Sequence, residues 1–298
     1  MKEKIVFIVN PISGHQDKRK FPTLVDNLID KDKYDYKISL TEYGGHARLL
    51  TKQAMDDGYD IIVAVGGDGT INEIATTMTG CEQTFAIVPC GSGNGLARHL
   101  HLPLKADKII TDVINKGVKT KIDTAAVNDK QFISIAGVGF DAIIADYFAQ
   151  DPHRGLKTYV KLVTEKYFHF KPENYHLILD DKLELDCQPL FISFANSNQF
   201  GNNAVVSPHA SLNDGLLDVC IFKKPNIVQL PNVAMKLMTQ KIDKTSIVDI
   251  HNAKKIKVIR EKEDVVNIDG EPIMMDKDIE VTINPLSLNI LLQKYINQ

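Results

Sequence analysis

Hydrophobic positions in residues 1–116 form short apolar runs that alternate with stretches of helical spacing. The run Ile61 to Val65 has no polar alternation, which is typical of a strand buried on both faces. Strands are also predicted at 4–9, 36–40 and 85–88, and a helix is predicted at 107–116. Strands that alternate with helices favour a mainly parallel sheet, with ligands at the carboxyl ends of its strands.

The pattern changes after about residue 120, where short β-rich runs follow one another with few helices between them. These runs are 121–127, 131–136, 175–179, 189–195, 217–222, 256–259, 265–268 and 279–283. They predict an antiparallel sandwich or barrel over residues 123–285, with helices at 154–168 and 226–238. The first domain is expected to span 1–122, and the apolar run Leu286 to Leu292 predicts that residues 286–298 return to it.

The turn Gly66-Gly67-Asp68-Gly69 follows the buried run directly. Its three glycines allow positive φ angles and a close approach of the backbone to a ligand. Thr70 is predicted to be the N-cap of a helix, and Glu73 would complete a capping box. Unpaired N–H groups at a helix start favour a phosphate, beside which Asp68 would hold Mg²⁺ or a hydroxyl group. The alternative is a tight strand-to-helix turn without a ligand.

Three other turns end predicted strands at the same edge of the sheet. Asn10 to Gly14 stops the first strand, Thr41 follows the second, and Gly91 to Gly95 follows the fourth. Side chains in such turns can bond either the backbone or phosphate oxygens. Lys18 to Lys20 head the next helix, where cations face an anion or solvent. The convergence of these turns predicts a ligand site on one rim.

Composition narrows the class of protein. The chain has 298 residues, enough for two domains, with 44% hydrophobic and 24% charged residues, as in soluble globular proteins. A net charge of −3 without a basic tail argues against a nucleic-acid partner. No apolar run is long enough to span a membrane and no signal-peptide pattern is present, so a cytoplasmic location is expected. The four cysteines are too scattered for a disulfide scaffold or a CxxC metal site, although Cys90 could be reactive.

Six motifs occur in an order that is specific to one family. They are NPISG (10–14), GGDGTINE (66–73), PCGSGNGLAR (89–98), GVGFDA (137–142), the stretch from Asn196 through NDGLLDV, and NIDGEP (267–272). In this order they resemble the diacylglycerol kinase catalytic family, which includes bacterial lipid kinases and sphingosine-kinase-like enzymes. The resemblance covers essentially the whole chain. It implies an α/β nucleotide-binding domain with a mainly parallel sheet, followed by an antiparallel β-sandwich domain.

The same resemblance implies an activity and roles for individual residues. The activity is ATP- and Mg²⁺-dependent phosphorylation of the hydroxyl of diacylglycerol or a related lipid, with Glu271 of the DGE motif as the proton acceptor. A structural magnesium loop is implied at Ser211, Asp214 and Leu216. The residues implied to contact ATP are Asn10, Ser13, Gly14, Thr41, Gly66, Gly67, Asp68, Gly69, Thr70, Asn72, Glu73 and Ser92. His15 and the segment 201–203 depart from the family pattern, which leaves the acceptor in question.

Two acidic positions carry most of the expected chemistry. Phosphoryl transfer depends on alignment and on cancellation of charge, so we expect Asp68 to hold Mg²⁺ directly or through water. Glu271 would act as the general base. The alternative is that Asp269 and Glu271 only bond backbone groups of their turn. Asp141 is expected to cap a helix that starts at Ala142.

A lipid substrate requires contact with a membrane surface, here the inner face, without a membrane span. An interfacial face is one interpretation of five aromatic residues, Tyr147, Phe148, Tyr167, Phe168 and Phe170. Such spacing is more typical of a core. Arg98, Arg154 and Lys157 could meet phosphates or lipid headgroups, but solvated charges are the commoner case. The sequence does not fix the oligomeric state, and a homodimer stays open.

Two other functions stay open at this point. GGDGT also occurs in NAD kinases, so a soluble-substrate kinase of that type is the alternative enzyme. Outside enzymes, the alternative is a nucleotide- or lipid-binding regulator without catalysis. The presence of both Asp68 and Glu271 argues against a regulator, because a binding protein does not need a base.

Overall fold

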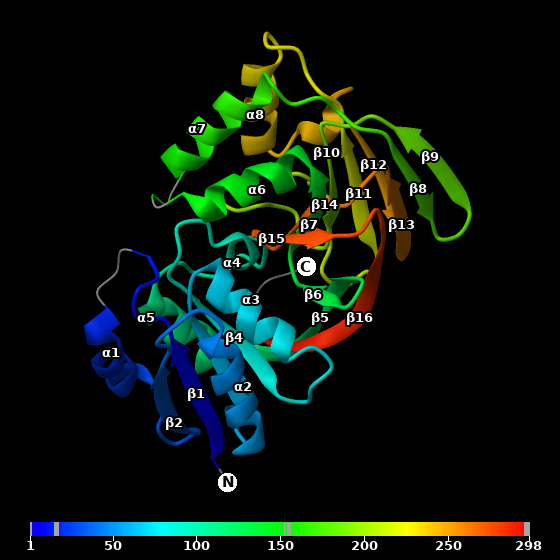
Figure 1. Ribbon diagram of the computed structural model, residues 1–298. Helices are drawn as coiled ribbons and strands as arrows, with labels where there is room; N and C mark the ends of the chain where they lie inside the picture. The colour runs from blue at the N-terminus through cyan, green and yellow to red at the C-terminus, as the bar shows by residue number, and fades with distance from the viewer. Residues whose placement is uncertain (1, 15–17, 152, 154–155, 295–298) are drawn as a thin grey trace. The chain divides into compact units, whose positions relative to one another are not determined.

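The computed structural model describes residues 2–14, 18–151, 153 and 156–294. The chain divides into two compact units, Met1–Asp123 with Leu286–Gln298, and Thr124–Pro285. It passes from one unit to the other twice, within strand β5 (Val118–Val127) and within strand β16 (Asp278–Leu292) (Figure 1). His15 and Arg154, both named above, lie outside the described residues.

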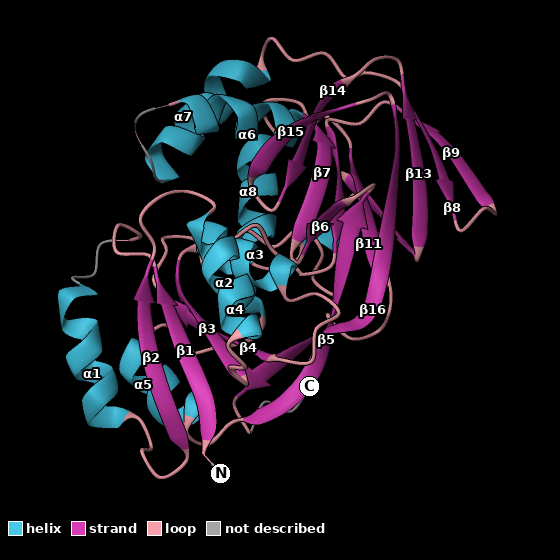
Figure 2. Ribbon diagram, turned by 60° about the horizontal axis from the view of Figure 1, so that its bottom comes forward, coloured by secondary structure: helices cyan, strands magenta, loops and turns pink. Residues whose placement is uncertain are grey.

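The first unit contains a parallel sheet with the strand order β2-β1-β3-β4-β16 (Figure 2). The other strand bounds are β1 Glu3–Val9, β2 Tyr34–Leu40, β3 Ile61–Gly66 and β4 Thr84–Pro89. Every residue of β3 and β4 is buried, which explains apolar runs without polar alternation. β16 joins this sheet at Ile290, which pairs with Phe85 of β4.

Helices connect the parallel strands of the first unit. Their bounds are α1 Phe21–Leu28, α2 His46–Asp56, α3 Asp68–Thr77, α4 Gly95–His99 and α5 Ala106–Lys108, with a 3₁₀ turn at Lys18–Lys20 and a π-helical segment at Ile109–Ile114. The four isoleucine and valine side chains of the π-helical segment are all buried. The helix predicted from their spacing is therefore confirmed, although its hydrogen bonds are wider than those of an α-helix.

The second unit contains two antiparallel layers. One has the order β12-β11-β10-β7-β14-β15, and the other continues from β16 through β13 and β8 to β9. The strand bounds are β6 Lys130–Phe132, β7 Ile135–Gly139, β8 Tyr175–Leu179, β9 Leu183–Cys187, β10 Phe191–Ala195, β11 Leu217–Phe222, β12 Val248–Ala253, β13 Lys255–Arg260, β14 Asp264–Ile268 and β15 Glu271–Met275.

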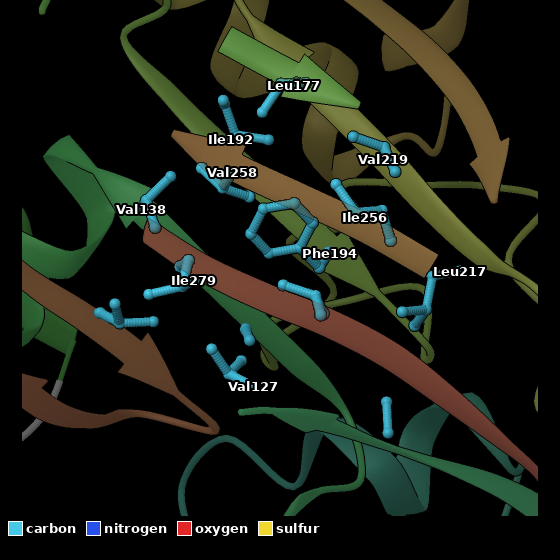
Figure 3. Close-up of a cluster of buried hydrophobic side chains, with 14 of the residues drawn as sticks. Val127, Val138, Leu177, Ile192, Phe194, Leu217, Val219, Ile256, Val258 and Ile279 are labelled. Carbon is cyan, nitrogen blue, oxygen red and sulfur yellow. The ribbon is translucent and has the colours of Figure 1, made fainter. Parts of the chain in front are cut away.

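A buried apolar core lies between these two layers (Figure 3). Val138 and Phe194 come from the first layer, Val258 and Ile279 from the second, and none is more than 3% exposed. Since side chains alternate along a strand, the residues between them point away from this core. On the outer face of the first layer lie helices α6 (Phe140–Gln150), α7 (Leu156–Tyr167) and α8 (Leu230–Met238), which bury their own apolar clusters.

The expected fold class is confirmed: a mainly parallel α/β unit and an antiparallel β-sandwich. Three strands were not expected from the sequence. β9 and β12 have mixed burial without a clean apolar alternation, and β15 contains Pro272, which lowers the strand signal. The helix expected at 226–238 begins only at Leu230, and α7 occupies most of the range expected for it.

Candidate functional site

The turn after β1 is held by its own side chains. The Asn10 N–H donates to the Val65 carbonyl at 2.9 Å, and Asn10 Nδ2 donates to Thr70 Oγ1 at 3.0 Å. Ser13 Oγ and Lys18 Nζ both donate to the Asn10 carbonyl, at 3.1 and 2.7 Å. Burial lowers the pKa of Lys18. The first turn is therefore fixed to the start of α3, with an ammonium group folded onto it.

Glycines let the three turns of this rim touch at backbone distance. A Cβ at Gly91 would lie 2.8 Å from Gly67 Cα, and a Cβ at Gly14 would lie 1.7 Å from the Cys90 carbonyl oxygen. Gly14 also has a φ of +65°, which favours glycine. The Cys90 N–H donates to the Gly66 carbonyl at 2.7 Å. Any larger residue at Gly14 or Gly91 would push these turns apart.

Asp68, in the first turn of α3, joins the two glycine-rich turns. Its carboxylate accepts the backbone N–H groups of Asn94 and Gly95 at 2.9 and 2.8 Å, so it caps the start of α4. Burial raises the pKa of Asp68, while the backbone N–H groups of Gly95, Asn94 and Asp68 itself, and the charge of Arg98, lower it. Each carboxylate oxygen thus accepts one N–H group from the second glycine-rich turn.

The predicted capping box at Thr70 and Glu73 is wrong. α3 begins at Asp68, with Gly67 at the N-cap position and no side chain capping it. Thr70 lies inside the helix, buried, where its hydroxyl accepts the bond from Asn10. Glu73 instead accepts the N–H of Gly45 at 3.0 Å, just before α2. The strand passes into the helix with a single residue between them, so no room is left for a separate cap.

The structure therefore brings together most of the residues predicted to contact ATP. Asn10, the segment 66–70 and the segment 91–95 are linked by the hydrogen bonds and close approaches given above. Thr41 is buried and its N–H donates to the Val9 carbonyl, so it follows β2 at the same edge. Asn72 is buried, while Gly69 and Ser92 are exposed. Exposed turns on a fixed frame suit the approach of a ligand.

A cavity of about 350 Å³ lies beside this rim, between the start of α1 and the second glycine turn. Lys18, Phe21, Leu24 and Cys90 contribute to its wall. Burial raises the pKa of the Cys90 thiol, although the charge of Lys18 lowers it. The expectation of a reactive Cys90 is not supported, since reactivity requires the thiolate.

In the second unit, Glu271 begins β15 directly after a two-residue hairpin turn. Ile268 pairs with Glu271, and the turn residues Asp269 and Gly270 have φ angles of +50° and +89°, as a type I′ turn requires. The Asp269 carboxylate accepts the backbone N–H groups of residues 133–135 at 2.7 to 2.9 Å. Asp269 therefore has a structural role, whereas the Glu271 side chain is exposed.

Asp141 does not cap its helix as expected. α6 begins at Phe140 with Gly139 at the N-cap position, and Asp141 is the second helical residue, only 5% exposed. Burial raises the pKa of Asp141 to about 7, against hydrogen bonds from Asn267 and from the backbone N–H groups of Ala142 and Asp141 that lower it. A buried carboxyl of this kind requires an explanation beyond helix capping.

The loop predicted to hold a structural magnesium ion is a compact turn. The Leu216 N–H donates to Asp214 Oδ1 at 3.0 Å, and Ser211 Oγ donates to Asn213 Oδ1 at 2.7 Å. Among the described residues, no group of three or more His, Cys, Asp or Glu could hold a metal ion. The loop offers one carboxylate and backbone carbonyl oxygens, which are donor types that Mg²⁺ accepts when water completes its coordination.

The aromatic residues considered for a membrane face separate into two groups. Tyr167 is 6% exposed and packs in the cluster beneath α6 and α7, and Phe148 and Phe170 pack partly against that cluster. Tyr147 and Phe168 are 40% and 58% exposed. Within the described ranges, none of the helices has both the length and the apolar content needed to cross a bilayer.

Lys18, which was expected to face an anion or solvent, bonds the first turn instead. Two other residues that organise these sites were missed in the sequence. Asn94, with a φ of +51°, bonds both the N–H and the carbonyl of Gly91. Asn267 links Asp141 to the Glu271 turn. Asn94 and Asn267 lie within motifs, but their spacing alone does not distinguish a positioning side chain from a turn residue.

The fold and the rim define a class of protein, a chain with a glycine-turn α/β unit and a β-sandwich unit. Residues 4–127 match the diacylglycerol kinase catalytic domain, and residues 134–292 match the YegS C-terminal NAD kinase beta sandwich-like domain. The chain therefore belongs to the diacylglycerol kinase catalytic family, as its motif order indicated.

Curated relatives agree with this assignment, and a solved structure agrees with the fold. A diacylglycerol kinase of Bacillus subtilis (strain 168) is 30% identical over 273 residues, covering 89% of this chain and 88% of its own. A diacylglycerol kinase of Staphylococcus aureus (strain MRSA252) is 28% identical over 281 residues, covering 91% and 87%. A crystal structure titled as a diacylglycerol kinase from Bacillus anthracis str. Sterne has a TM-score of 0.74 at 19% identity, covering 99% of this chain and 98% of its own, and supports the fold alone.

Proposed function

We propose that this chain is an ATP- and Mg²⁺-dependent lipid kinase that phosphorylates the hydroxyl group of diacylglycerol or a related lipid. The observation that carries the proposal is the close contact of the glycine turns in a chain that matches this family over both units. Backbone N–H groups in such turns provide a cradle for phosphates. The names of the relatives supply the substrate class.

In this proposal the triphosphate of ATP is bound by the rim of the first unit. Its contacts come from the set named above, Asn10, Ser13, Gly14, Thr41, Gly66, Gly67, Asp68, Gly69, Thr70, Asn72, Glu73 and Ser92. Asn10 and Thr70 already bond each other, so they would hold the frame, whereas exposed Gly69 and Ser92 would meet the phosphates. Mg²⁺, when bound, would neutralise charge on the phosphate oxygens.

Asp68 and Glu271 have different proposed roles. Both oxygens of Asp68 accept backbone N–H groups, so Asp68 would orient the metal through water more readily than by direct ligation. Glu271 would accept the proton of the lipid hydroxyl. Its exposure at the start of β15 supports this role, because a general base must reach the substrate. Ser211, Asp214 and Leu216 are proposed to hold a separate, structural Mg²⁺.

The protein is proposed to act at the inner surface of the membrane without spanning it. Tyr147 and Phe168 are the aromatic candidates whose exposure would allow contact with lipid. A cytoplasmic, peripheral enzyme could reach diacylglycerol in this way. A homodimer is compatible with this proposal, which does not depend on it.

A coupled assay of ADP release tests the proposed function. Purified protein with ATP and Mg²⁺ would be given dispersed diacylglycerol in one arm and NAD in the other. We expect turnover with diacylglycerol only, and a radiolabelled phospholipid product on thin-layer separation. Turnover with NAD alone would favour an NAD kinase, a candidate because the second unit matches an NAD kinase beta sandwich-like domain. ATP binding in calorimetry, without turnover on any lipid or on NAD, would favour a regulator.

A further inference from the structure

A row of three residues crosses the outer face of the six-stranded layer. Gly137 of β7 pairs with Ser193 of β10 on one side and with Asn267 of β14 on the other. Residues directly opposite each other in antiparallel strands project to the same face. Their neighbours Val138 and Phe194 point into the sandwich core, so this row points away from it, toward α6.

Asp141 occupies the space above Gly137. A Cβ at Gly137 would lie 2.3 Å from Asp141 Oδ2, so only glycine admits this carboxyl group. Asn267 Nδ2 donates to the same oxygen at 3.3 Å. Among the described residues, neither Asp141 Oδ1 nor the Ser193 hydroxyl has a hydrogen-bond partner. A buried carboxyl group over a strand glycine is costly, so its presence here indicates a role beyond packing.

Asn267 connects Asp141 to the hairpin turn through two hydrogen bonds. Its Oδ1 accepts the Gly270 N–H at 2.8 Å, while its Nδ2 faces Asp141. A side-chain amide has one accepting and one donating end, so an acceptor at Asp141 fixes which end faces the turn. Without Asp141, the amide of Asn267 could rotate and present Nδ2 to the Gly270 N–H, which would break that bond.

We propose that Asp141 is a positioning residue which, through the amide of Asn267, fixes the Asp269–Gly270 turn that presents Glu271. The catalytic part of this inference rests on the proposed function, in which Glu271 is the base. The Asp269 carboxylate anchors the turn on one side, through residues 133–135, and Asn267 anchors it on the other. Hydrogen bonds on both sides hold the turn in a single conformation. A general base needs such a fixed position for proton transfer.

Amide hydrogen exchange at Gly270, followed by NMR at pH 7, tests the structural link without any substrate. We expect exchange at least tenfold faster in Asp141→Ala than in the wild type. Asp141→Asn should exchange within about twofold of the wild type, because an amide oxygen at position 141 can still accept from Asn267. Asp146→Ala, at an acidic residue of the same helix that accepts a bond from Gln150, is the matched control and should leave Gly270 unchanged.

Kinetics test the catalytic consequence. In Asp141→Ala we expect kcat for lipid phosphorylation to fall about 10- to 100-fold, with KM for ATP within twofold of the wild type. Asp141→Asn should restore most of kcat. If Asp141 had only a structural role, Asp141→Ala would lower the thermal stability and the fraction of active protein. It would not lower kcat of the folded enzyme at an unchanged KM for ATP, and Asp141→Asn would not restore kcat. If Asp141→Ala does not fold, Asn267→Ala replaces it, with the same expected results.

The outcomes separate the two proposals. Unchanged exchange at Gly270 in a folded Asp141→Ala overturns the structural link, whatever happens to activity, even if Asn267→Ala exchanges faster. Faster exchange together with wild-type kcat overturns the positioning role. Faster exchange in a protein whose wild type has no lipid kinase activity confirms the link and rejects the proposed function instead.

Discussion

At the scale of single residues, half-buried carboxylates in this protein hold backbone in place. Asp68 and Asp269 each accept N–H groups from a distant segment, the first to start α4 and the second to fix the segment before β7. A charged acceptor makes such hydrogen bonds about twice as strong as neutral ones. Their replacement therefore disturbs both geometry and charge, so amide variants are more informative than alanine variants.

The proposed base is tested by Glu271→Gln. We expect kcat for diacylglycerol phosphorylation to fall about 10²- to 10⁴-fold, because the amide cannot accept the proton. ATP affinity in calorimetry should be unchanged, because Glu271 is not among the residues proposed to contact ATP. Glu263→Gln, at an exposed glutamate of the same unit, is the control. Wild-type turnover in the folded Glu271 variant would remove this residue from the mechanism.

The raised pKa of Asp141 predicts a pH-dependent stability. The folded state keeps the Asp141 proton up to about pH 7, whereas the unfolded chain loses it near the ordinary value of 3.8. Stability is therefore lost as pH rises from about 4 to 7, at about 1.4 kcal/mol per pH unit. Asp141→Asn removes this loss, so relative to the wild type its free energy of unfolding should rise by about 4 kcal/mol over that range.

Denaturant unfolding at several pH values measures this difference. Tyr159 and Tyr175, whose pKa values the Asp141 charge raises further, stay neutral throughout the range. Asp146→Asn on the same helix should show a profile parallel to that of the wild type. Parallel profiles for Asp141→Asn and the wild type would mean that Asp141 is already ionised in the folded protein at pH 4 to 7.

At the scale of elements, two glycines of the rim have opposite surroundings. Gly91 lies against the backbone of Gly67, while a Cβ at Gly69 would meet nothing within 4 Å. A glycine in open space at the start of a helix is not required by packing, so its use there is consistent with a ligand that approaches the backbone. Substitutions at Gly91 therefore test the packing of the turns against each other, whereas substitutions at Gly69 test the proposed contact with ATP.

Gly91→Ala and Gly69→Ala should have different effects. Gly91→Ala should cost about 1 to 3 kcal/mol of stability, because its Cβ would overlap backbone atoms that must shift. Gly69→Ala should leave stability unchanged or slightly higher, since alanine favours the helix, but should raise KM for ATP about tenfold. Thermal unfolding and initial rates measure both. Unchanged ATP kinetics in Gly69→Ala would argue against phosphate contact there.

Elements set by local sequence patterns could be predicted, whereas contacts between residues far apart in the chain could not. β3, β4 and β11 follow from buried β-rich runs, and the turn at Asp269–Gly270 follows from its residues, but the strand β15 that completes the hairpin was not expected. The capping box failed because local spacing cannot tell that Thr70 bonds Asn10, which is far away in the chain. Likewise, the relation of Asp141 to Gly137 and Asn267 depends on strand pairing, which the sequence does not specify.

At the scale of the whole molecule, the first unit is completed by residues from the far end of the sequence. Leu288 and Ile290 of β16 are fully buried, and the Leu286 N–H donates to Asp123 Oδ1 at 2.6 Å. The Gly80 N–H donates to the Ser287 carbonyl. Pairing between segments so far apart in the chain carries an entropic cost of loop closure. Because β16 completes the core of the first unit, that unit should be stable only when both chain segments are present.

Ile290→Ala tests this dependence. We expect a loss of about 2 to 5 kcal/mol in the free energy of unfolding, because a fully buried side chain leaves a cavity at the strand that pairs with β4. ATP binding should be lost at a correspondingly lower denaturant concentration. Lys294→Ala, at an exposed position after the strand, should stay within about 0.5 kcal/mol of the wild type. Equal midpoints for the two variants would show that β16 contributes little to the first unit.

The Asp269–Gly270 turn also has a consequence for the chemical ageing of the protein. Aspartyl–glycyl bonds isomerise when the glycine nitrogen attacks the aspartyl carboxyl carbon and forms a succinimide. Here the carboxylate is held by three backbone N–H groups and the glycine N–H is held by Asn267, so neither reactant can turn toward the other. Asp57–Gly58 and Asp214–Gly215 are also aspartyl–glycyl bonds, and both aspartates are exposed, so isoaspartate should accumulate at these two bonds before it does at Asp269 during long storage.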